Sequence, residues 1–201
     1  MIIGPDFVWL HWPKCGGTAT EIALRKLLSH RRDISFDEID DVSGVWHDSI
    51  YERQKRSPSF DPEGRRIISG IRRLPYWLLS ISHFEISRGE QPATREMILE
   101  GKVYTGGGLE ISADQVIGSF NKPRIDSWIR TENMSEDIAR TFNISNRTVK
   151  AALREKNVGM ISYVKKLSFW FTSKELSGLY SANPIWASAE LEAYGDILTA
   201  T

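Results

Sequence analysis

The chain has 201 residues, and its 26 Lys and Arg balance its 26 Asp and Glu. A chain of this length fits one α/β domain, residues 1–201, and can bury roughly 70% of its unfolded surface. The zero net charge excludes an overall field that would draw the protein to nucleic acid or to an anionic membrane, so any basic site must be local.

Cysteine and apolar content exclude further classes of protein. The single cysteine, Cys15, rules out an internal disulfide and a cysteine metal cluster. A membrane helix needs about 18 uninterrupted apolar residues, and no segment approaches this length. The N-terminus lacks the basic start and the long apolar region of a signal peptide. We therefore expect a soluble, cytoplasmic protein with no membrane partner.

Residues 7–28 predict a strand, a glycine loop and a helix. The apolar run 7–11 is typical of a strand that is buried on both faces, and the turn WPKCGGT follows at once. From Thr18 onward apolar residues recur at helical spacing, with Glu21 expected in the first turn.

This loop is suited to an anion, because the first N–H groups of a helix lack internal partners and the helix dipole makes its start partly positive. Gly16 and Gly17 permit positive φ and let a ligand oxygen approach without meeting a Cβ. Lys14 adds a charge, and Thr18 can cap the helix or donate its hydroxyl. The lysine precedes the glycines, so the loop is not a Walker A sequence, GxxxxGK[ST].

A second strand is predicted at residues 66–71, with Arg72 at its carboxyl end. Open parallel sheets bind ligands outside the carboxyl ends of their strands, so we expect Arg72 beside the Lys14 loop if the two strands are neighbours. Pro75 suits the first turn of the helix that follows. Before this strand, the charged segment 53–66 predicts an exposed loop.

The remaining elements are predicted from apolar spacing and turn residues. Residues 106–108, three glycines, are read as a connector or as a mobile loop near an acceptor site. A short strand is expected within residues 34–45 and a third main strand at 124–130. Helices are predicted at residues 93–100, 113–119, 145–155, 172–181 and 188–194.

The loop PKCGGT, residues 13–18, resembles the PKTGGT or PKCGGT loop of sulfotransferases that use 3′-phosphoadenosine 5′-phosphosulfate (PAPS), especially the carbohydrate-type branch. The resemblance implies a P-loop-like three-layer fold with a central parallel sheet flanked by helices. It also implies that the loop binds the 5′-phosphosulfate, with Lys14 at the bridging oxygen. The residues that this assigns to the nucleotide are Lys14, Cys15, Gly16, Gly17, Thr18 and Ala19.

Two later segments add to the resemblance. Related enzymes carry a pattern like RDPxxRxxSxY, in which an arginine and a serine eight positions later bind the 3′-phosphate; Arg72 and Ser80 have that separation, although Arg73 replaces the aspartate. A guanidinium fork and a hydroxyl donor suit a dianionic phosphate. Residues 124–142 resemble a third family block, FxxRxENLxxDF, in which Asp137 is expected to pair with Arg130 or to cap a helix.

The resemblance implies a direct transfer of a sulfuryl group from PAPS to a hydroxyl or amine of a small-molecule or carbohydrate acceptor, with no metal. Lys14 faces the oxygen on which charge develops. Relatives often place a histidine or glutamate before the arginine strand, so His47 is the candidate general base and His83 its competitor.

Other interpretations stay open. A kinase or nucleoside triphosphatase would need a Walker lysine and a magnesium-binding Ser or Thr, and neither is evident. A non-catalytic nucleotide-binding protein of the same fold is compatible with the short chain and the imperfect second block. The acceptor and the oligomeric state are not encoded in any readable motif.

Overall fold

The computed structural model describes residues 1–39, 44–120, 124–153 and 163–199. The chain divides into two compact units, Met1–Ile71 with Phe120–Val158 and Arg72–Ser119 with Gly159–Thr201. The expected single domain stays a prediction. Within the described ranges, no helix has the combination of length and apolar character that crossing a membrane requires.

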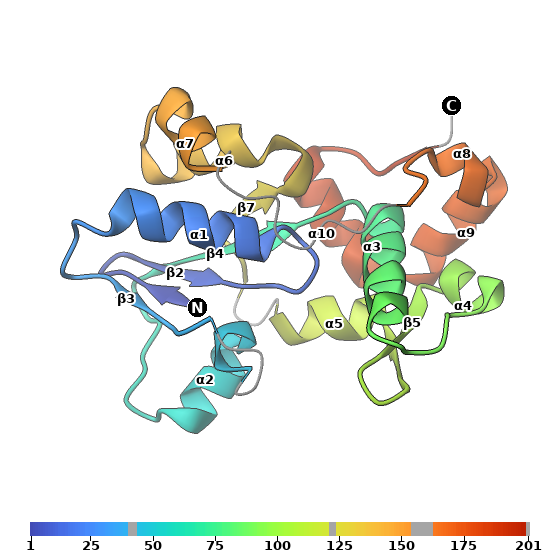
Figure 1. Ribbon diagram of the computed structural model, residues 1–201, viewed down its shortest axis with the longest axis horizontal. Helices are drawn as coiled ribbons and strands as arrows, with labels where there is room; N and C mark the ends of the chain where they lie inside the picture. Colours follow the sequence, from blue (N-terminus) through green and yellow to red (C-terminus); the bar gives the residue numbers. More distant parts are fainter. Residues whose placement is uncertain (40–43, 121–123, 154–162, 200–201) are drawn as a thin grey trace. The chain divides into compact units, whose positions relative to one another are not determined.

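The first unit is built on a five-stranded mixed sheet in the order β3-β1-β2-β4-β7 (Figure 1). The strands are β1 (Ile2–Ile3), β2 (Phe7–Leu10), β3 (Ser35–Phe36), β4 (Arg66–Ile71) and β7 (Ser127–Arg130). Three adjacent strands, β2, β4 and the edge strand β7, run parallel, with Leu10 opposite Ser69 and Ile71 opposite Arg130. The α/β class and the adjacency of the first two predicted strands are therefore confirmed.

The sheet is mixed because β1, a strand that was not predicted, runs antiparallel to both of its neighbours. Only residues 4–6 separate β1 from β2, and a link this short can join only antiparallel strands. The turn is closed by a 2.9 Å hydrogen bond from the Gly4 amide to the Phe7 carbonyl. β1 also pairs antiparallel with β3, the short strand expected within residues 34–45.

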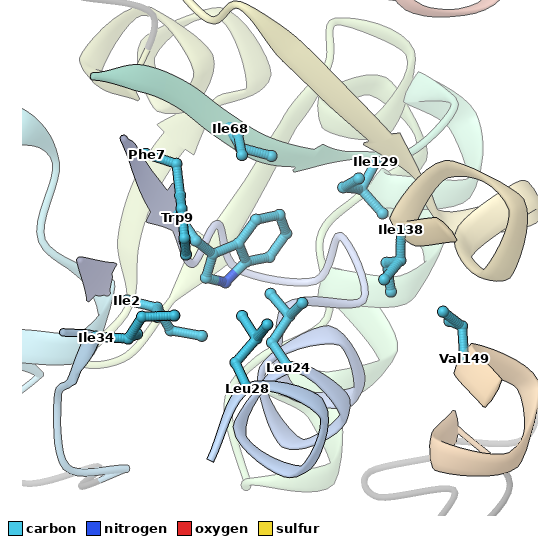
Figure 2. Packing of buried hydrophobic residues seen from close by; sticks show 10 residues of the cluster. All are labelled: Ile2, Phe7, Trp9, Leu24, Leu28, Ile34, Ile68, Ile129, Ile138 and Val149. Carbon is cyan, nitrogen blue, oxygen red and sulfur yellow. The ribbon is translucent and has the colours of Figure 1, made fainter. Parts of the chain in front are cut away.

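Helices α1 (Gly17–Leu28), α6 (Met134–Phe142) and α7 (Asn146–Leu153) pack against one face of this sheet. Figure 2 shows the core, in which the Trp9 indole lies between Leu24 and Leu28 of α1 and the isoleucines Ile68 and Ile129 of the neighbouring strands. Val8 and Leu10, which alternate with Trp9, are fully buried as well. This two-sided burial explains the uninterrupted apolar run of β2. The predicted end of α7, residues 154–155, lies outside the described residues.

The connection between β3 and β4 differs from the prediction of an exposed loop at residues 53–66. It contains a short turn η1 (Val45–His47) and helix α2 (Ile50–Arg56). A capping box starts α2: the Ser49 hydroxyl accepts from the Glu52 amide at 3.3 Å, and Glu52 Oε2 accepts from the Ser49 amide at 2.7 Å. Ser49 and Glu52 form the S-x-x-E pattern that indicates a helix start, but the charged residues that follow favoured a loop.

The second unit holds most of the remaining helices and a β-hairpin. The helices are α3 (Leu74–Ser87), α4 (Arg95–Leu99), α5 (Ala113–Phe120), α8 (Leu167–Trp170), α9 (Ser173–Ala182) and α10 (Pro184–Tyr194). The hairpin pairs β5 (Lys102–Thr105) with β6 (Leu109–Ser112), so the three glycines 106–108 form its turn. Two of them, Gly107 and Gly108, take the positive φ that this turn needs.

A buried carboxylate fixes the start of α3. Glu190 on α10 accepts from the Leu74 amide at 2.8 Å, from the Tyr180 hydroxyl at 2.7 Å and from Arg73 Nη1 at 3.0 Å. Arg73 also bonds Asp196 Oδ1 at 2.5 Å, and its guanidinium stacks on the Tyr194 ring. Arg73 therefore holds helices together.

Candidate functional site

The predicted anion loop joins the carboxyl end of β2 to the first turn of α1. Its backbone turns sharply, with φ of 62° at Lys14 and 75° at Gly16. Gly16 is the N-cap of α1 and offers no side-chain acceptor to the first N–H groups of the helix. Thr18 lies inside the first turn, so the expectation that it could cap the helix is wrong.

The glycines of the loop are required by close packing. A Cβ at Gly16 would lie 2.4 Å from the Met134 methyl, and a Cβ at Gly17 would lie 2.2 Å from Cδ2 of His11. Gly17 does not take positive φ, which falls on Lys14 instead. Space for the His11 ring, more than conformational freedom, therefore explains the glycine at position 17.

The remaining loop residues differ in exposure. The Cys15 side chain is buried, whereas Lys14, Thr18 and Ala19 are half-buried. Within the described residues, the Thr18 hydroxyl makes no side-chain hydrogen bond. Thr18 is thus the loop hydroxyl that can donate to an anion bound at the start of α1.

His11 and Glu21 form a buried pair next to this loop. His11 Nδ1 lies 2.8 Å from Glu21 Oε2, and Arg25 Nη2 donates to Glu21 Oε1 at 2.9 Å. Glu21 is fully buried, not in the first turn as expected, because α1 begins at Gly17 and Glu21 follows a full turn later. No motif in the sequence indicated this pair.

Burial sets the protonation of the pair. It lowers the pKa of His11 to about 4, against the opposing effect of the Glu21 hydrogen bond. Burial alone would raise the pKa of Glu21, but the His11 hydrogen bond, the Met1 ammonium and Arg25 hold that pKa below its usual value. At neutral pH the pair is therefore a neutral imidazole beside a carboxylate.

The predicted base His47, in η1, contacts the chain just before the same loop. Its Nδ1 donates to the His11 carbonyl oxygen at 3.0 Å, and the centroids of the two imidazole rings are 4.5 Å apart. Trp46 packs against both rings, 4.2 Å from His11 and 4.5 Å from His47. The first unit thus brings His47, His11 and the start of the Lys14 loop together.

Arg72 and Ser80 belong to the second unit. Arg72 follows Ile71 directly, so the chain leaves the sheet at the carboxyl edge of β4, and its carbonyl accepts from Trp186 Nε1 at 3.2 Å. In the described part of the chain, the half-buried Arg72 guanidinium forms no ion pair and Ser80 no side-chain hydrogen bond. A half-buried guanidinium without a carboxylate is suited to an anionic ligand.

The competing histidine, His83, also belongs to the second unit. Its Nδ1 donates to the Leu79 carbonyl at 2.8 Å, and its ring stacks on Tyr163 with 4.8 Å between centroids. Trp170 meets the same ring edge-on at 5.5 Å. These contacts give His83 a packing role in α3.

In the third block, Asp137 makes the predicted pair with Arg130, which donates from Nε at 2.8 Å. Among the described residues, no three His, Cys, Asp or Glu side chains gather as a metal site would require.

Comparisons of the chain with protein-family models, with curated proteins and with solved structures found no match.

Proposed function

We propose that this chain is a PAPS-dependent sulfotransferase with a P-loop-like fold. The observation that carries the proposal is the lysine-led glycine loop PKCGGT, which links the central parallel strand β2 to the start of α1. Ligands of open α/β sheets bind at this edge, and helix N-termini favour anions. The loop binds the 5′-phosphosulfate, while Arg72 and Ser80 bind the 3′-phosphate.

The chemical step is a direct transfer. An oxygen or nitrogen of the acceptor attacks the sulfur, the bond from sulfur to the bridging phosphate oxygen breaks, and its electron pair stays on that oxygen. Lys14 and the first N–H groups of α1 stabilise the charge that develops there, so they act more strongly in the transition state than in the ground state. The acceptor proton passes to His47 as general base. The step uses no metal.

The geometry around His47 supports its role as a base. A backbone carbonyl only accepts hydrogen bonds, so the contact with His11 requires a proton on His47 Nδ1. In the neutral ring, Nε2 then carries the lone pair. His47 contacts the residue that precedes the loop and belongs to the same unit as Lys14, whereas His83 belongs to the second unit.

Calorimetric titration tests the nucleotide assignment. The desulfated product, 3′-phosphoadenosine 5′-phosphate, should bind more tightly than ATP and more tightly than adenosine 5′-phosphate. A preference for ATP, or indifference to the 3′-phosphate, rejects the roles of Arg72 and Ser80 and favours the kinase interpretation.

Transfer of labelled sulfate from PAPS to a panel of alcohols, phenols, amines and sugars tests catalysis. Transfer to one chemical class identifies the acceptor. Tight binding of the product nucleotide without transfer to any member identifies a non-catalytic nucleotide-binding protein.

A further inference from the structure

The buried Glu21 carboxylate acts on the His11 ring. Both side chains are almost fully inaccessible, and the two carboxylate oxygens are shared between His11 and Arg25. An ionised carboxylate only accepts hydrogen bonds, so His11 Nδ1 carries a proton in this pair. Glu21 therefore fixes both the orientation and the tautomer of the His11 ring.

His11 in turn acts on His47 in two ways. Its backbone carbonyl accepts from His47 Nδ1 at 3.0 Å, and its ring packs on the His47 ring. The Trp46 indole contacts both imidazoles, so neither ring can turn without displacing a buried neighbour. The His11 ring also fills the space that a Cβ at Gly17 would take.

We infer that Glu21 and His11 are positioning residues that hold His47 beside the Lys14 loop with Nε2 as its proton acceptor. This inference rests on the proposed function for its catalytic consequence. Glu21 would also favour the positive charge that His47 acquires with the acceptor proton, because a neutral His11 leaves the carboxylate charge in place. In this arrangement Glu21 touches neither substrate nor nucleotide.

The charged groups around the two rings come from several elements. Glu21 and Arg25 lie on α1, and the Met1 ammonium approaches from β1 and pairs with Asp37 at 2.9 Å. Asp48, the residue after His47, is buried and pairs with Arg53 at 3.3 Å and with Arg56 at 3.1 Å. Asp37 and Asp48 are held by these cations, as Glu21 is by Arg25. Because Glu21 also bonds the His11 ring directly, its substitution is the change that tests the positioning effect.

Glu21→Gln is the test variant, because it keeps the shape of the side chain and removes its charge. We expect kcat to fall about tenfold, part of the 10²–10⁴-fold that a general base contributes. We expect KM for PAPS to change less than about twofold, because Lys14 and the loop are untouched. The acid limb of the kcat profile should move to lower pH, since the protonated His47 loses a favourable charge.

Asp137→Asn is the matched control. Among the described residues of this unit, Asp137 is the other fully buried carboxylate on a helix, and it pairs with Arg130 and Arg140 at 2.8 Å each. Its substitution should lower stability to a similar extent and leave the position of the acid limb unchanged. An equal effect of both variants on that limb would mean that Glu21 is merely structural.

Nitrogen-15 NMR of the imidazoles tests the inference without any activity. In the wild type, His11 and His47 should both show a protonated Nδ1 and an unprotonated Nε2 at neutral pH. In Glu21→Gln, which can donate as well as accept, His11 should lose this single tautomer. Wild-type rings with the proton on Nε2 would overturn the inference; the expected tautomers without any sulfate transfer would overturn the proposed function alone.

Discussion

The carbonyl oxygen of Cys15 lies 2.7 Å from the point where a Cβ at Gly70 would be. The anion loop therefore rests directly on the backbone of β4, the strand that leads to Arg72. A side chain at position 70 would therefore have to displace the loop.

Gly70→Ala should displace the loop and destabilise the protein by about 1–3 kcal/mol, the usual range for overpacking in a core. Binding of 3′-phosphoadenosine 5′-phosphate should weaken at the same time, measured by calorimetry together with urea unfolding. Gly178→Ala on α9 is the control, because nothing lies within 4 Å of its added Cβ. Equal behaviour of the two variants would contradict the close contact.

Removal of the Lys14 amine should reduce kcat on the order of 10²–10³-fold, by analogy with loss of one oxyanion-stabilising donor. Two variants separate charge from backbone strain. Lys14→Gly relieves the φ of 62° and should be more stable than Lys14→Ala, while both lose the same catalytic contribution. Steady-state kinetics with thermal unfolding measures both effects; a loss confined to KM would argue against transition-state stabilisation.

Arg72→Gln should weaken binding of 3′-phosphoadenosine 5′-phosphate by about 10–100-fold, the equivalent of one charge-assisted hydrogen-bonding group. Affinity for adenosine 5′-phosphosulfate, which lacks the 3′-phosphate, should stay unchanged. Calorimetry with both nucleotides is the measurement, and parallel losses for the two would be inconsistent with a 3′-phosphate contact.

The neighbouring Arg73→Gln should behave in the opposite way. It leaves Glu190 buried without its cation, and loss of one partner of such a pair costs about 3 kcal/mol or more of stability. Urea unfolding should show this loss, while the remaining folded protein keeps its preference for the 3′-phosphate. A stable Arg73→Gln variant with no such preference would exchange the roles of the two arginines.

Stability should fall as the pH drops from about 6.5 to about 4, because the folded pKa of His11 lies below its usual value. The unfolded chain binds the proton first, so His11 favours folding fully above pH 6.5 and loses that contribution on acidification. The shift corresponds to about 3 kcal/mol. Urea midpoints of the wild type and of His11→Gln, compared between pH 7 and pH 4.5, should converge at the acid end.

Much of the sheet could be predicted from local pattern. The apolar runs before Lys14 and Arg72 predicted β2 and β4, because every residue of β2 and residues 67–71 of β4 are buried. β1 was missed because a two-residue strand leaves no period to detect. The hairpin of β5 and β6 was missed although Val103 alternates with polar neighbours, because its three-glycine turn was interpreted as a connector.

The candidate site was predicted less completely. Lys14, His47 and the glycines were singled out by residue type, but the pairing of Glu21 with His11 depends on where α1 begins. An acidic residue near a helix start normally indicates a solvated first turn. Only the fold shows that this carboxylate faces inward against the end of β2.

The order of the three parallel strands along the chain also bears on biosynthesis. β4 ends at Ile71, whereas its partner strand β7 ends at Arg130. β7 therefore leaves the ribosome well after β2 and β4. Until then β4 has one unsatisfied edge, and closure over so long a segment is slow. A nascent chain stalled before β7 should therefore depend on chaperones more than the finished protein does.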